Sequence, residues 1–85
     1  MQDDPFVPNS ALVIEATADF DAGRYPRSAA LWEGLAQRAE SLSDRRSAAS
    51  AWGAAAEAWR RAKQPYLAAL EDIRSREHNE LEAAR

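Results

Sequence analysis

The sequence predicts an all-α protein of about four antiparallel helices, arranged as two stacked helix hairpins. Alanine occurs 20 times among the 85 residues, and Leu, Glu and Arg, also strong helix formers, supply much of the rest. Val and Ile together number only four, so no segment has the β-branched enrichment of a strand. Segments 23–31 and 63–70 look like two copies of one helix–turn–helix joint, with Tyr25 and Tyr66 41 positions apart.

One helical domain, residues 10–85, is expected to follow an extended lead-in at residues 1–9, which carries two prolines. The domain divides into helix pairs at about residues 10–42 and 44–85. A chain this short buries only about 60% of the surface of its unfolded form. Its core is therefore marginal unless it is well packed or shared with another subunit.

The first helix is expected to end near Ala22, because Gly23 readily adopts the left-handed conformation that closes a helix. Asn9 or Ser10 can cap its start by accepting a bond from a free backbone N–H. Its apolar residues recur at helical spacing: Leu12, Val13, Ala16 and Phe20.

The second helix is expected to start near Pro26, since the missing N–H of proline costs nothing in the first turn. Ser43 or Asp44 should then cap the third helix. The predicted buried stripe of the second helix is Ser28, Leu31, Trp32, Leu35, Ala39 and Leu42.

Residues 47–62, in the third helix, are apolar on nearly every face. A helix without a polar face must be sandwiched between others. Its side chains form two seams: Trp52, Ala55, Ala56, Trp59 and Ala62 on one side, and Ala51, Ala54 and Ala58 on the other. The bulky seam should interlock with one neighbour, and the alanine seam should let another backbone approach closely.

The fourth helix is expected to begin at Pro65 and to become strongly polar beyond Arg74. Its last turns should therefore project into solvent or reach a partner. The predicted inner face is Tyr66, Ala69, Leu70, Ile73 and Leu81.

The joints, with their Gly-x-Tyr-x-x-Ser and Pro-Tyr-x-x-Ala patterns, make residues 10–76 resemble tetratricopeptide-like repeats. Segment 58–69 is especially similar to the longer repeats of large bacterial transcriptional regulators. The repeat of 41 residues exceeds the usual 34, which implies helices about a turn longer. Two helix pairs also fall below the three or so repeats that such arrays need, so we expect a homodimer that covers the open faces.

The resemblance implies that the first and third helices line a concave groove that binds a protein or peptide partner. The groove residues by this alignment are Val13, Thr17, Phe20, Ala54, Ala58 and Arg61. The Lys/Asn clamp with which chaperone-binding members hold a peptide carboxylate is missing. The predicted groove is thus shallow and largely apolar, with Arg61 as its obvious cation.

Segment 20–25, followed by a helix and the Arg45-Arg46 doublet, resembles a small bacterial all-helical family of unknown function. That family carries a His-Glu pair just after the tyrosine. Ala29 and Ala30 occupy those positions here, so the chemistry of the pair is absent. The alternative hypothesis is accordingly a ligand-binding or vestigially enzymatic helical bundle.

Composition excludes several other classes. The net charge of −3, with both signs interspersed, argues against nucleic-acid binding. Cysteine is absent, and no apolar run approaches a membrane span of about 20 residues, so we expect a soluble cytoplasmic protein. Arginine outnumbers lysine ten to one, which with the alanine content suggests a GC-rich bacterial genome.

No residue pattern predicts catalysis, a cofactor or a metal. His78 and Glu82 lie four positions apart, but two ligands at a polar helix end make a poor metal site, and an exposed histidine is the preferred interpretation. Glu15, Asp19 and Asp21 are expected to form a solvated face. The three tryptophans are expected to pack in the core. The leading hypothesis is a non-catalytic protein–protein interaction or assembly module.

Overall fold

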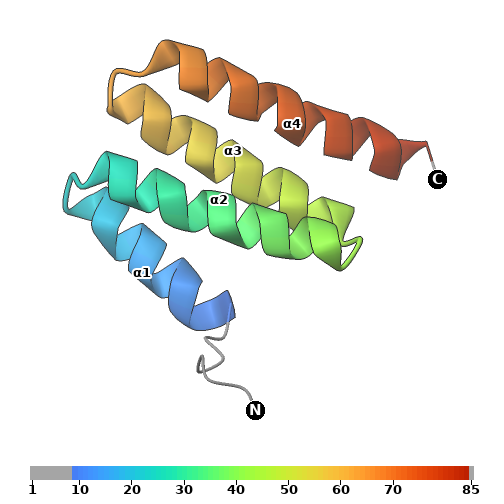
Figure 1. Ribbon diagram of the computed structural model, residues 1–85, viewed down its shortest axis with the longest axis horizontal. Coiled ribbons are helices and arrows are strands. Elements are labelled where there is room, and N and C mark those ends of the chain that lie inside the picture. Colours follow the sequence, from blue (N-terminus) through green and yellow to red (C-terminus); the bar gives the residue numbers. More distant parts are fainter. Residues whose placement is uncertain (1–8, 85) are drawn as a thin grey trace.

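The computed structural model describes residues 9–84 as four α-helices. In chain order they are α1 (Asn9–Asp21), α2 (Tyr25–Ser41), α3 (Arg45–Arg61) and α4 (Pro65–Ala83). Successive helices run antiparallel, and each packs mainly against its neighbours in the chain (Figure 1). No strand occurs in the described residues, so the all-α prediction is confirmed. Of the predicted lead-in only Asn9 is described, and it begins α1; residues 1–8 lie outside the described residues.

The three interhelical turns repeat one backbone geometry every 20 residues. The second residue after the end of α1, α2 and α3 has a positive φ: 82° at Gly23, 58° at Ser43 and 64° at Lys63. The N–H of each bonds to the carbonyl three residues back, and the next N–H bonds to the carbonyl five residues back, at 2.8–3.0 Å. These paired bonds are the Schellman motif that closes helices. The chain is therefore a series of similar helix–turn units.

The 20-residue interval corrects the predicted repeat of 41 residues. Helices α2 and α4 begin at Tyr25 and Pro65, which gives a spacing of 40 between equivalent positions. Tyr25 packs edge-on against Phe20, with ring centroids 5.2 Å apart, whereas Tyr66 is 74% exposed. Tyr66 is therefore one position off the register of Tyr25 and does not act as the same anchor.

Helix α3 lies between α2 and α4 and carries most of the core, as its all-round apolar pattern predicted (Figure 1). Trp52 is 2% exposed, and it packs in a cluster with small residues from α2 and α3: Leu35, Ala36, Ala39, Ala48 and Ala51. Alanine methyl groups let the helix backbones approach closely. At Gly53, an added Cβ would lie 3.5 Å from the hydroxyl of Ser75, an ordinary contact distance.

The predicted inner face of α4 is wrong. Its larger apolar residues are exposed: Tyr66, Leu70, Ile73 and Leu81. The side of α4 that packs on the rest of the molecule instead carries Ala68, Glu71, Ser75 and His78, and Ser75 donates a 2.8 Å bond to the Ala49 carbonyl. Large residues of α3 already fill the interface, so small and polar side chains of α4 fit against it.

The turn between α2 and α3 confirms one prediction and corrects another. Asp44 caps α3 by accepting a 3.2 Å bond from the backbone N–H of Ser47. Leu42, predicted to complete the buried stripe of α2, is 73% exposed. It follows the last residue of α2 and belongs to the turn.

Candidate functional site

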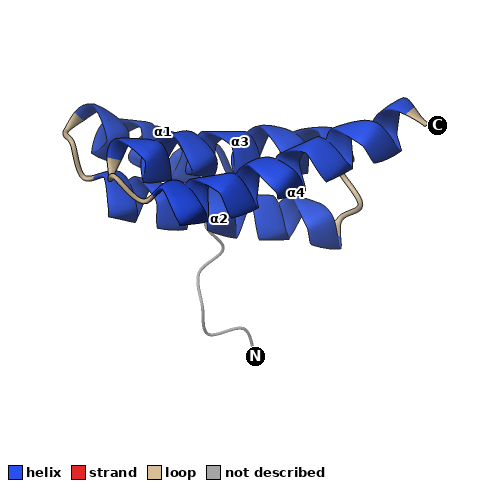
Figure 2. Cartoon of the chain, turned by 90° about the horizontal axis from the view of Figure 1, so that it is seen from above, coloured by secondary structure: helices blue, strands red, loops and turns tan. Residues whose placement is uncertain are grey.

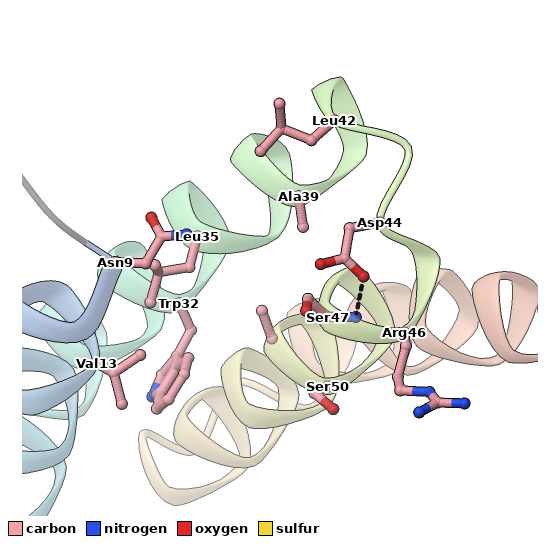
Figure 3. A pocket seen from close by; sticks show the side chains of 11 residues that line it. Asn9, Val13, Trp32, Leu35, Ala39, Leu42, Asp44, Arg46, Ser47 and Ser50 are labelled. Atoms are coloured by element: carbon pink, nitrogen blue, oxygen red, sulfur yellow. Dashed lines mark hydrogen bonds between the residues drawn. The ribbon is translucent and has the colours of Figure 1, made fainter.

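An apolar depression forms a notch between α1, the C-terminal end of α2 and the first turns of α3 (Figure 3). Its volume is about 390 Å³. Small-molecule and peptide-anchor pockets span roughly 300–1,000 Å³. The lining residues are Asn9, Val13, Trp32, Leu35, Ala39, Leu42, Asp44, Arg46, Ser47, Ser50 and Ala51. The floor is apolar and the polar side chains lie at the rim, which is the usual anatomy of a recognition site.

The notch exists because the described part of α1 does not cover the whole of α2. Helix α1 has 13 residues and α2 has 17. The first described residue, Asn9, accepts a 2.7 Å bond from Arg38, so no described residue of α1 lies opposite the chain from Ala39 to the end of α2. Ala39 and Leu42 then face the space where another helical turn would fit.

The rim of the notch carries one unpaired cation. Arg46 is exposed and makes no hydrogen bond or ion pair with any residue between 9 and 84. Asp44 is already engaged, because its hydrogen bonds with Ser47, together with the charge of Arg46, hold the pKa of its carboxyl below 3.8. Among residues 9–84, the nearby charge of Asp44 is therefore the only electrostatic interaction of Arg46.

The predicted groove residues are divided between two places. Val13 lines the notch. Phe20, at the opposite end of α1, lies under the Arg61 guanidinium at 5.2 Å, and Arg61 is also bonded to Glu57 at 3.1 Å. Ala58 is fully buried, so it offers no surface to a partner, whereas Thr17 is exposed and Ala54 is partly exposed. The predicted role of these residues in binding stays a prediction.

A cluster of polar side chains joins α2 to α4 across α3. The Glu40 carboxylate accepts a 2.8 Å bond from Trp52 Nε1 and faces His78 Nε2 at 2.8 Å. A carboxylate only accepts, so His78 Nε2 carries the proton in this contact. Burial raises the pKa of Glu40, but the bonds from His78 and Trp52 outweigh burial and lower the pKa below 4.5.

About two helical turns before Glu40 on α2, Glu33 makes an equivalent set of contacts. It accepts a 2.8 Å bond from Trp59 Nε1 and is hydrogen-bonded to Glu71 of α4. Burial and the contact with Glu33 raise the pKa of Glu71 from 4.5 to about 8, although Arg74 opposes the shift. A bond between two carboxyl groups needs a proton, and Glu71 retains it at neutral pH. We call the two sets together the polar seam, formed by Glu33, Glu40, Trp52, Trp59, Glu71 and His78.

The polar seam was missed at the level of sequence, and His78, expected to be exposed, is mostly buried against Glu40. The available signal was spacing, since each helix contributes two members seven residues apart. Seven residues make about two helical turns, so both members lie on one face. Recognising the pattern required knowing that the three faces meet.

The prediction of a solvated acidic face on α1 holds for Glu15 and Asp21, which are exposed, but it is wrong for Asp19. Asp19 is 3% exposed. It accepts a 2.7 Å bond from Arg24 and pairs with Arg27 at 3.3 Å. Asp19 therefore ties the end of α1 to the start of α2 and has a structural role.

Neither a metal site nor a membrane span is found in the described part of the chain. No group of three or more His, Cys, Asp or Glu side chains between residues 9 and 84 is arranged to hold a metal ion. No helix within that range is long and apolar enough to cross a bilayer.

Comparisons with family models, with curated proteins and with solved structures give no match.

Proposed function

We propose that this protein is a small, non-catalytic protein–protein interaction or assembly module of tetratricopeptide-like type, and that it works as a homodimer. The observation that carries the proposal is the helix–turn unit that recurs every 20 residues with the same turn bonds. Repeats of this kind bury their apolar faces against neighbouring repeats, so the terminal units need a cap or a partner.

The terminal helix α4 supports this proposal, because it has a helix packed on one side only. Its other side exposes Tyr66, Leu70, Ile73 and Leu81. The notch beside α1 is a second apolar surface that residues 9–84 leave uncovered. Helix α1 lies at the opposite edge of the row of helices from α4 (Figure 1). Contiguous apolar surface of this sort, rimmed by polar residues, is typical of protein interaction sites.

Sedimentation equilibrium between about 5 and 500 μM tests the proposal through the concentration dependence of association. The monomer has a mass of 9.4 kDa. We expect the apparent mass to rise to twice that value. A mass of 9.4 kDa at every concentration would refute the homodimer.

The alternative function, ligand binding by a helical bundle, has one specific observation in its favour. Glu71 Oε1 and His78 Nδ1 are buried and have no hydrogen-bond partner within residues 9–84. Buried polar atoms without partners are uncommon in folded proteins. A thermal-shift screen with metabolites and metal ions tests this function, since a ligand that binds the native state raises its stability by RT ln(1 + [L]/Kd). Stabilisation that is lost in Glu71→Gln would favour it over assembly.

A further inference from the structure

The C-terminal end of α4, here called the α4 tail (residues 73–83), has chemistry complementary to the notch. Ile73 and Leu81 are each about half exposed. Two shallow hollows along the α4 tail are lined by Ile73, Arg76, Glu77, Glu80 and Leu81. Glu77 and Glu80 form no hydrogen bond or ion pair with any residue of the described range. The α4 tail therefore presents apolar side chains beside the carboxylates of Glu77 and Glu80 and the guanidinium of Arg76.

The notch offers the opposite charge beside an apolar floor. Arg46 is unpaired at its rim, and the exposed floor residues include Val13 and Leu42. The notch also lies where a further turn of helix would fit against α2. An amphipathic helix end with acidic residues matches that space in shape, hydrophobicity and charge.

The α4 tail and the notch lie at the same end of the molecule. Helix α1 begins, α2 ends, α3 begins and α4 ends at this end (Figure 1). Both views show α4 extending past the turn between α2 and α3 (Figure 2). The α4 tail is separated from the notch of its own chain by α3, so these two surfaces do not meet within one molecule.

We infer that two copies of this chain associate end to end, with the α4 tail of each protomer docked in the notch of the other. Glu77 and Glu80 of one protomer face Arg46 of its partner, and Leu81 packs on the apolar floor. Reciprocal docking makes both contacts twice around a two-fold axis, which closes the assembly as a dimer instead of a filament. This inference rests on the proposed self-association and names its surfaces.

Charge reversal tests the pairing with little risk to the fold. Arg46 is the second residue of α3, where an acidic side chain is favourable to the helix dipole. Glu77 and Glu80 are exposed near the C-terminus of α4, where basic side chains are favourable. The variants Arg46→Glu and Glu77→Arg/Glu80→Arg should therefore keep the melting temperature and helical circular dichroism of the native chain.

Each of these variants alone should have a dimer dissociation constant at least about tenfold above that of the native chain, because attraction becomes repulsion in both copies of the contact. Mixed in equal amounts, they should form a heterodimer of native affinity. In that heterodimer the introduced glutamate of one variant meets the introduced arginines of the other, and the native Arg46 meets the native glutamates. Sedimentation equilibrium of each variant and of the mixture measures these constants.

Arg45→Glu is the matched control. It makes the same change in net charge one position away, but Arg45 does not line the notch. Equal weakening by Arg45→Glu, or a mixture that stays monomeric, would overturn the reciprocal docking. A native dimer unaffected by Arg46→Glu would overturn the docking and leave the proposed homodimer intact. A native chain that remains monomeric would overturn both.

Discussion

Glu33 of α2 and Glu71 of α4 hydrogen-bond to each other across α3, although both side chains are carboxyl groups. The contact forms because Glu71 is mostly buried and retains a proton that a solvated glutamate would lose. Trp59 completes the set by donating its indole N–H to Glu33. A contact that depends on the Glu71 proton thus links α2 and α4, which are not neighbours in the chain.

The Glu71 proton predicts that stability falls as the pH rises. The pKa of Glu71 is about 8 in the native state and 4.5 when it is unperturbed. Between these values the native state binds a proton that the unfolded state has released, so the free energy of unfolding decreases with pH across this window and levels off above about 8. Urea denaturation at about pH 5, 7 and 9 measures the decrease.

Glu71→Gln is the control for that decrease, since glutamine donates to Glu33 without titrating. The variant should lose most of the pH dependence between 4.5 and about 8 and should match or exceed the native chain in stability above that window. If both proteins lose stability equally over the window, Glu71 is not the group responsible.

Trp52→Phe should destabilise the protein by about 2–4 kcal/mol. The substitution removes the donor to Glu40 and leaves a gap at a side chain that is 2% exposed. Trp59→Phe is the matched comparison, because Trp59 makes the same kind of bond to Glu33 but is only partly buried. Trp59→Phe should lower the free energy of unfolding by less than Trp52→Phe does. Equal losses in chemical denaturation would show that burial does not distinguish the two sites.

The positive φ angles at Ser43 and Lys63 predict that glycine is preferred at both turns. A left-handed conformation costs a residue with a Cβ about 1 kcal/mol. Ser43→Gly and Lys63→Gly should each raise the free energy of unfolding by up to about that amount. Gly23→Ala should lower it by a similar amount, because Gly23 has a φ of 82° and its surroundings are open. Calorimetric melting of the three variants checks the signs, and stabilisation by Gly23→Ala would contradict the argument.

Two serine hydroxyls each bond to a backbone carbonyl of the preceding helix, and the two serines differ in how deeply they are buried. Ser28 Oγ donates to the Ala16 carbonyl and Ser75 Oγ to the Ala49 carbonyl, each at 2.8 Å. Ser28 is fully buried and Ser75 is partly exposed. Ser28→Ala should cost about 1–2 kcal/mol and Ser75→Ala about half as much, because water can replace the bond only at the second site. A larger loss at Ser75, measured by urea denaturation, would refute this ranking.

The sequence determined the helices and their order, because helix formation depends on local properties. High alanine content, Gly23, and prolines near two helix starts are sufficient to place four helices within a residue or two of their observed ends. The central position of α3 was also predictable, since a helix apolar on nearly every face must be enclosed. Cap chemistry likewise identified Asp44.

The tertiary structure decided which faces meet, and sequence reasoning failed mainly on α4. Hydrophobicity favoured Leu70, Ile73 and Leu81 for the interface, but Glu71, Ser75 and His78 occupy it. Polar side chains are buried there because α2 and α3 supply matching carboxylate, indole and carbonyl groups. Such matches depend on residues far apart in the chain, so no local pattern reveals them.

The candidate sites show the same division. Val13 was predicted to face a partner from the resemblance to tetratricopeptide-like repeats; it lines the notch, and its role in binding stays a prediction. The notch itself depends on how far α1 extends along α2, and the polar seam depends on three helices meeting in one register. Local sequence therefore determined the secondary structure, whereas the notch and the shared proton of Glu71 arise only from the packing of helices against one another.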